Sequence, residues 1–142
     1  MDRLKVENIK SDYGFLPEYR VIESSEAEKI VCKLREKYCI EETENMRLLA
    51  EILKNSVSVS RADDDFNLEI LLENIGIESV KEILITWDGF KEIDKIRVKE
   101  FNYYFFDLWY EGIDNIAAVD ISCSWILFIL RNGDVRVSRC IK

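Results

Sequence analysis

The first clear hydrophobic periodicity is helical and follows residues 1–20, a poorly patterned opening segment that ends near Pro17. We predict that a helix starts at Ser24 or Ser25, because Glu28 lies three residues after Ser25, the spacing of a capping box. Its apolar residues recur at helical spacing, and they are Ala27, Ile30, Val31, Leu34 and Tyr38.

A second helix and an extended segment are predicted next. The helix starts at about Thr43, and its apolar side carries Met46, Leu49, Ala50 and Leu53. The short joint at residues 40–42 indicates that the two helices pack as antiparallel neighbours. Val57 and Val59 then alternate with serines, which predicts a short strand or an extended connection.

The middle of the chain predicts a helix followed by a strand. The helix is expected to begin within residues 60–65, because acidic residues favour the positive end of the helix dipole, and to stop at Gly76. Its inner face would carry Phe66, Ile70, Leu71 and Ile75. Residues 82–88 alternate in the manner of a strand, and Asp88-Gly89 closes it with a turn.

The last third predicts a helix and a β-meander. Residues 97–110 fit either a helix or an aromatic strand, and we favour a helix with Asp94 as its N-cap. A short strand is expected at residues 117–121. The run 125–130 precedes Asn132-Gly133, the strongest short hairpin signature, in which both turn residues are expected to take positive φ. The run is apolar on both faces, so it should be a central strand.

These elements predict a single α+β domain spanning residues 1–142. N-terminal helices should pack on one face of a small antiparallel sheet that ends in a C-terminal β-meander or hairpin. The length and the 48% hydrophobic content suit one domain with a real core.

Charge narrows the classes of partner. The formal net charge is −8, from 28 acidic and 20 basic residues, which opposes binding to nucleic acid and to anionic membranes. It favours a basic protein partner, although negative charge also serves solubility alone. With no apolar run in the N-terminal segment and four cysteines that we expect to be free thiols, the sequence predicts a cytoplasmic protein.

The candidate chemistry is limited to carboxylates, because the chain has no histidine and no Gly-rich phosphate loop. We therefore expect no catalytic residue, no cofactor and no metal site. Asp63, Asp64 and Asp65 are interpreted as a solvated helix start. The alternative is a metal-dependent enzyme acting on a small molecule, in which Asp107, Asp114 and Asp120 converge.

Six aromatic residues lie within residues 103–110, more than one helix can bury against a sheet. The stretch from Glu100 to Asp120 also has five acidic residues and no basic one. Exposed aromatic surface beside acids is typical of protein-binding sites. The candidate partner-binding residues are Tyr103, Phe106, Asp107, Trp109, Tyr110, Glu111 and Asp114, and Asp63, Asp64, Asp65 and Trp87 are further candidates for the same surface.

The C-terminal third resembles small uncharacterised bacterial proteins, some of which look like immunity or antitoxin-type partners of secreted toxins. The similar steps are Asp107-x-Trp109-Tyr110, Asp114-Asn115-Ile116 and the strand from Trp125 to Ile129 before a Gly turn. The chain departs from that pattern because it lacks a proline after the Trp-Tyr step and a histidine before the turn. The resemblance implies a cytoplasmic inhibitor of a basic toxin or nuclease domain. A homodimer that buries the surplus aromatic residues across a two-fold axis is the third hypothesis.

Overall fold

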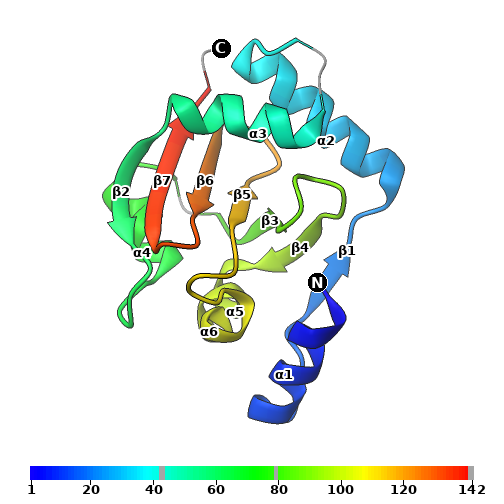
Figure 1. The fold of residues 1–142 in the computed structure, drawn as a ribbon, viewed down its shortest axis with the longest axis vertical. Coiled ribbons are helices and arrows are strands. Elements are labelled where there is room, and N and C mark those ends of the chain that lie inside the picture. Colours follow the sequence, from blue (N-terminus) through cyan, green and yellow to red (C-terminus); the bar gives the residue numbers. More distant parts are fainter. Residues whose placement is uncertain (42–43, 79, 141–142) are drawn as a thin grey trace.

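The computed structural model describes residues 1–41, 44–78 and 80–140, and within these ranges a seven-stranded sheet forms the centre of the protein (Figure 1). All neighbouring strands are antiparallel. Their spatial order is β1 (Tyr19–Val21), β4 (Asp94–Arg97), β3 (Glu82–Thr86), β5 (Ile116–Val119), β6 (Trp125–Ile129), β7 (Asp134–Arg139) and β2 (Val57–Arg61). The inner strands therefore come from the second half of the chain, and β1 and β2 form the edges.

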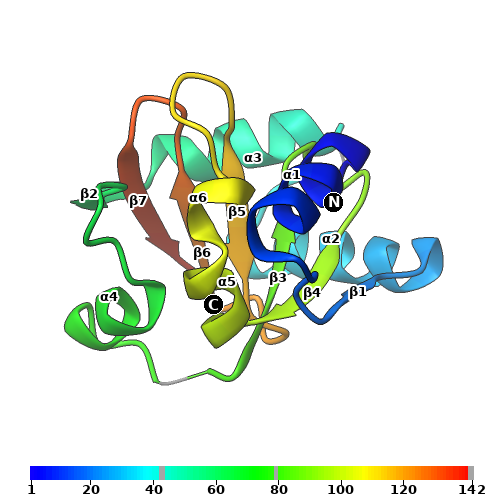
Figure 2. The same cartoon turned by 90° about the horizontal axis from the view of Figure 1, so that it is seen from below.

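Helices cover both faces of this sheet. On one face lie α2 (Ser24–Tyr38) and α3 (Asn45–Lys54). On the other lie α1 (Arg3–Tyr13), α4 (Leu68–Asn74), α5 (Val98–Tyr103) and α6 (Phe105–Leu108), which Figure 2 shows in front of the sheet. The α+β class, with N-terminal helices on one face of an antiparallel sheet, is confirmed. The sheet is larger than predicted, and its second face is covered as well.

The hydrophobic core is divided by β6, whose five residues are all buried. Ile126 and Phe128 belong to the core under α2 and α3. Trp125, Leu127 and Ile129 belong to the core on the opposite face. The prediction that this strand is central, because it is apolar on both faces, is thus confirmed.

The hairpin between β6 and β7 is confirmed, but its turn differs from the prediction. Gly133 has φ +89°, whereas Asn132 does not take positive φ. The Gly133 N–H donates to the Leu130 carbonyl at 2.8 Å, and the Leu130 N–H donates to the Asp134 carbonyl at 2.9 Å. These bonds describe a three-residue loop with a left-handed glycine rather than a two-residue turn.

The opening segment is more ordered than its weak pattern indicated. Helix α1 is capped by the Asp2 carboxylate, which accepts a hydrogen bond from the Lys5 N–H at 2.9 Å, and it ends at Gly14. Only Lys5 and Ile9 of this helix are buried, so its apolar face is too narrow to show in the sequence. The chain then supplies β1 before α2.

Two predicted helix starts need correction. Helix α2 begins at Ser24 as expected, but its N-cap is Glu23 and no side chain caps it, so the capping box at Ser25 is not formed. Thr43 and the end of the 40–42 joint lie outside the described residues. Residues 60–65 are not a helix start, because the strand β2 continues to Arg61 and α4 begins only after its cap, Asn67.

The helix predicted over 97–110 is present as two short helices, α5 and α6, which meet at Tyr104. Asp94 is not its N-cap. It lies in β4, where its buried carboxylate pairs with the Met1 ammonium group and where burial raises its pKa above the ordinary value. Residues 94–97 form the strand β4 because their side chains alternate between the core and the surface, with Asp94 and Ile96 buried. The helix therefore begins only at Val98.

Two further findings concern membrane-spanning helices and the cysteine thiols. None of the helices in the described part combines the length and apolar character that a membrane crossing requires. Cys32, Cys39 and Cys123 are free thiols, as predicted; the first two are exposed and Cys123 is buried.

Candidate functional site

The aromatic segment of α5 and α6 is anchored by a buried lysine from α1. The Lys5 ammonium group lies 2.6 Å from the Asp114 carboxylate, and these side chains are only 4% and 12% exposed. The ammonium group also lies 4.4 Å from the centre of the Tyr110 ring, in cation–π contact. Asp114 accepts a second hydrogen bond from the Tyr110 N–H at 2.7 Å. Asp114 therefore stabilises the loop before β5 and is not a free surface charge.

The two tryptophans among the candidate residues both donate hydrogen bonds inside the protein. Trp109 is 4% exposed, stacks on Phe105 with ring centres 5.7 Å apart, and donates its indole N–H to the Asp114 carbonyl at 3.0 Å. Trp87 is half-buried, and its indole N–H donates to the Leu108 carbonyl at 3.0 Å. Both rings hold α6 against the sheet, and Trp109 is not available to a partner.

The exposed part of the aromatic segment forms a cluster with the end of α1. Tyr103 is 60% exposed and Phe106 50%, and Phe15, which follows α1, is 59% exposed. Tyr103 and Phe15 flank the buried Tyr104, with ring centres 4.9 Å and 6.3 Å from it, while Phe106 packs on the buried Phe105 with ring centres 5.5 Å apart and is followed directly by Asp107. With two neighbouring acids they form what we call the aromatic–acidic patch: Asp12, Tyr13, Phe15, Tyr103, Phe106 and Asp107.

The two acids of the patch repel each other. Burial, and then the adjacent carboxylate of Asp12, raises the pKa of Asp107 above its ordinary value of 3.8. The Tyr110 hydroxyl donates to Asp107 at 3.2 Å, which opposes this rise only in part. The pKa of Tyr13 is raised by burial and then by the charge of Asp107. The patch is therefore a site of concentrated negative charge among aromatic rings.

The remaining predicted acids lie elsewhere. Asp63, Asp64 and Asp65 are exposed in the connection between β2 and α4, at the β2 edge of the sheet and away from α1 (Figure 2). The Asp65 N–H donates to the Asp63 carboxylate, so these residues form a local turn. Glu111 is exposed beyond Tyr110. The structure does not bring the three consecutive aspartates into the patch.

The carboxylates of the enzyme hypothesis do not converge. Asp114 precedes β5 and pairs with Lys5, whereas Asp120 follows the same strand and accepts from the Ser122 hydroxyl at 2.7 Å. Across residues 1–41, 44–78 and 80–140, no three His, Cys, Asp or Glu side chains are grouped as metal ligands. The arrangement that the metal-dependent alternative requires of Asp107, Asp114 and Asp120 is not formed.

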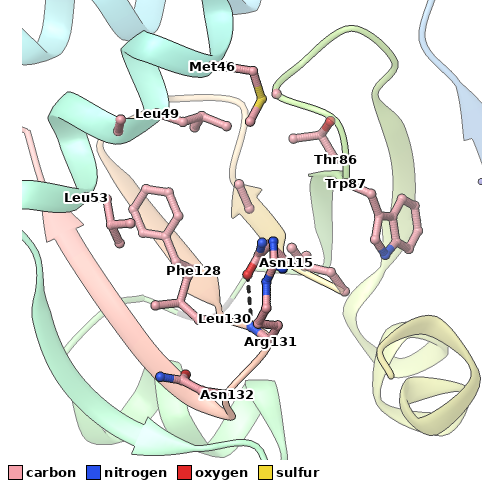
Figure 3. Close-up of a pocket in the computed structure, with 14 residues that line it drawn as sticks. Met46, Leu49, Leu53, Thr86, Trp87, Asn115, Phe128, Leu130, Arg131 and Asn132 are labelled. Atoms are coloured by element: carbon pink, nitrogen blue, oxygen red, sulfur yellow. Dashed lines mark hydrogen bonds between the residues drawn. The ribbon is translucent and has the colours of Figure 1, made fainter. Parts of the chain in front are cut away.

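Sequence reasoning missed an apolar groove on the opposite face, which we call the α3 groove. It has a volume of about 410 Å³ and lies between α3 and the ends of β3, β5 and β6 (Figure 3). Met46, Leu49 and Leu53 form one wall, and Phe128 and Leu130 lie against them. Met46, a large apolar residue near the start of α3, was the one indication of this groove in the sequence. The strands that complete the groove lie far from Met46 in the chain.

Comparisons with protein-family models, with curated proteins and with solved structures found no match to this chain.

Proposed function

We propose that the chain is a non-catalytic binding protein that holds a basic protein partner on the aromatic–acidic patch. The observation that carries this proposal is the exposure of Tyr103, Phe106 and Phe15, each at least half exposed, beside two acids of which one has a raised pKa. Large exposed rings at a charged surface are the usual composition of binding hot spots.

The chemistry of the patch favours arginine or lysine side chains. A cation placed over Tyr103 or Phe106 would gain a cation–π contact, and the carboxylates of Asp12 and Asp107 would supply charge-assisted hydrogen bonds. Such a cation would also relieve the repulsion between the two acids. The net charge of −8 would steer a basic domain toward the surface.

We further propose an immunity-type role, in which the partner is a basic toxin or nuclease domain and the complex forms in the cytoplasm. The resemblance of the C-terminal third to immunity-type proteins supports this role. The free thiols of Cys32 and Cys39, both exposed, support a reducing compartment. Binding of the patch over a basic active site would block access of that enzyme's substrate.

The binding experiment uses the purified product of the gene beside this one, because immunity proteins are normally encoded next to their toxins. Calorimetry with the wild type should give a saturable one-to-one complex. Tyr103→Ala and Phe106→Ala should each weaken it by about thirty-fold, the usual loss at a hot spot of about 2 kcal/mol. Ile121→Ala is the matched control, since Ile121 is 65% exposed outside the patch.

Three outcomes would contradict the proposal in separable ways. A complex that Tyr103→Ala and Phe106→Ala leave unchanged would remove the patch as the binding surface. Absence of a complex, together with no protection of cells that express the neighbouring gene product, would remove the immunity role. A two-chain mass in light scattering that Phe106→Ala reduces to one chain would instead support the homodimer.

A further inference from the structure

The α3 groove combines an apolar body with a single charged group at one end. Its walls are the side chains of Met46, Leu49 and Leu53 on α3 and of Phe128 on β6. Figure 3 shows Met46 and Thr86 at one end, and Asn115, Arg131 and Asn132 toward the other. A volume of about 410 Å³ lies within the range of small-molecule sites, which are mostly apolar with few polar groups.

The charged residue of the α3 groove, Arg131, is positive, whereas the net charge of the chain is negative. Arg131 is the one charged residue among the described residues that line the groove, although the chain as a whole has a net charge of −8. Its guanidinium group makes no ion pair or side-chain hydrogen bond within the described residues. Five N–H donors are therefore available at the edge of an apolar groove.

The backbone of Arg131 is fixed although its side chain is free to bind. The Arg131 N–H donates to the Asn115 side-chain oxygen at 2.9 Å, and the Arg131 carbonyl accepts from the Gly112 N–H at 2.7 Å. These bonds hold the β6–β7 turn, which contains Arg131, against the loop before β5. A guanidinium group on a fixed backbone loses less conformational freedom when it binds an anion.

The opposite end of the groove is closed by one flexible side chain. A Cβ atom on Gly89 would lie 2.3 Å from the Met46 sulfur, so Met46 packs directly over this glycine. Met46 is nevertheless 63% exposed. Methionine adapts its shape to an irregular apolar ligand because it is unbranched, which allows the groove to admit a chain of variable length.

We propose that the α3 groove binds a small amphipathic carboxylate, with its apolar chain between α3 and the sheet and its carboxylate paired bidentately with Arg131. The apolar lining supplies the affinity when water leaves it. The guanidinium fork selects a planar carboxylate over a neutral or cationic head group. This site is independent of the aromatic–acidic patch, which lies on the other face of the sheet.

The test uses decanoate as the probe, with decan-1-ol and decylammonium as head-group controls. Binding is followed by calorimetry. Saturable one-to-one binding of decanoate, at least about ten-fold tighter than that of decan-1-ol, is expected from a charge-assisted pair. Equal binding of decanoate and decylammonium, or no saturable binding of decanoate, would overturn the proposal.

Variants locate the site. Arg131→Gln should weaken decanoate by about ten-fold, and Ala50→Trp should prevent binding by filling the groove. Arg47→Gln removes an equivalent charge from an exposed position on α3 outside the lining and should leave binding unchanged. Full binding by the folded Ala50→Trp variant, or an equal loss in Arg131→Gln and Arg47→Gln, would refute the site.

A measurement on the wild type guards against a misfolded variant. In methyl NMR spectra, decanoate should shift the signals of Leu49, Leu53, Ala117 and Leu130, which line the groove. Ile121 and Ile70, both exposed elsewhere, should not move. Shifts that concentrate instead on residues around Phe106 would assign the binding to the aromatic–acidic patch and would overturn the groove as the site.

Discussion

The ammonium group of Lys5 lies 2.6 Å from the carboxylate of Asp114, although the two residues are 109 positions apart in the chain. This pair joins the first helix to the loop that follows the aromatic segment. It fixes α1 beside α6, and so brings the Tyr13 ring to 5.4 Å from that of Tyr103 and the Asp12 carboxylate next to that of Asp107. The proposed binding patch therefore depends on a contact that does not belong to it.

Lys5→Met tests this dependence. The variant leaves the 12% exposed carboxylate of Asp114 without its cation, and breaking such a buried pair is expected to cost about 3 kcal/mol of unfolding free energy. The double variant Lys5→Met/Asp114→Asn should recover part of the loss, because no buried charge remains. Urea denaturation gives the values. Arg3→Gln is the control, since its exposed pair with Glu7 should contribute under about 1 kcal/mol.

The raised pKa of Asp107 predicts a pH dependence with a definite sign. The folded state binds this proton more tightly than the unfolded chain, so the contribution of Asp107 to the free energy of unfolding should fall as the pH rises from about 3.8 through the raised value. Asp12→Asn removes the second cause of the rise. Carboxyl-carbon NMR should show the Asp107 pKa moving down toward its ordinary value in this variant and not in Asp64→Asn. An unchanged titration would show that burial alone sets the pKa.

Gly89 is predicted to resist substitution for two separable reasons. Its φ of +73° costs an alanine about 1–2 kcal/mol, and the new Cβ would meet the Met46 sulfur. Gly89→Ala should therefore lower the free energy of unfolding more than Gly76→Ala, where φ is +79° and no atom lies within 4 Å. The excess should vanish when Met46 is also alanine. Equal losses in both single variants would mean that Met46 moves aside freely.

Cys123 should react more slowly than the exposed thiols of Cys32 and Cys39. Burial raises its pKa to about 11, whereas Cys32 and Cys39 are exposed. A disulfide reagent at pH 8 should modify the two exposed thiols within minutes and should reach Cys123 only after urea unfolds the chain, because the thiolate is the reactive form. Mass spectrometry of the labelled peptides identifies each site. Rapid labelling of Cys123 in the folded protein would contradict its position in the core.

The sequence predicted best where the determinants are local. The Asn132-Gly133 turn, the two-faced apolar run of β6 and the amphipathic α2 each depend on residues within a few positions of one another. The two-residue form of the turn was wrong because only Gly133 takes positive φ. Helix α1 was missed because its largest buried side chains are a lysine and an isoleucine, and the lysine finds its partner only in the folded chain.

The candidate site was predictable in part for the same reason. The excess of aromatic residues correctly implied that some of them lie at the surface, and Tyr103 and Phe106 do. The identity of the surface residues depended on α1. Its Lys5 pairs with Asp114, and the ring centre of Tyr13 lies 5.4 Å from that of Tyr103. The α3 groove joins residues from position 46 to position 132, and no local pattern reports such a juxtaposition.

The placement of β1 and β2 at the two edges of the sheet has a consequence for biosynthesis. β1 and β2 are synthesised before their partners, because they pair only with β4 and β7, which come from residues 94–97 and 134–139. The early helices thus remain without the surface on which they pack until most of the chain has emerged. A nascent chain stalled with residues 1–80 exposed should be cut rapidly by a protease, and the released full chain should resist it. Folding of this domain therefore waits for the synthesis of β7, and β1 and β2 gain their strand partners later than they are made.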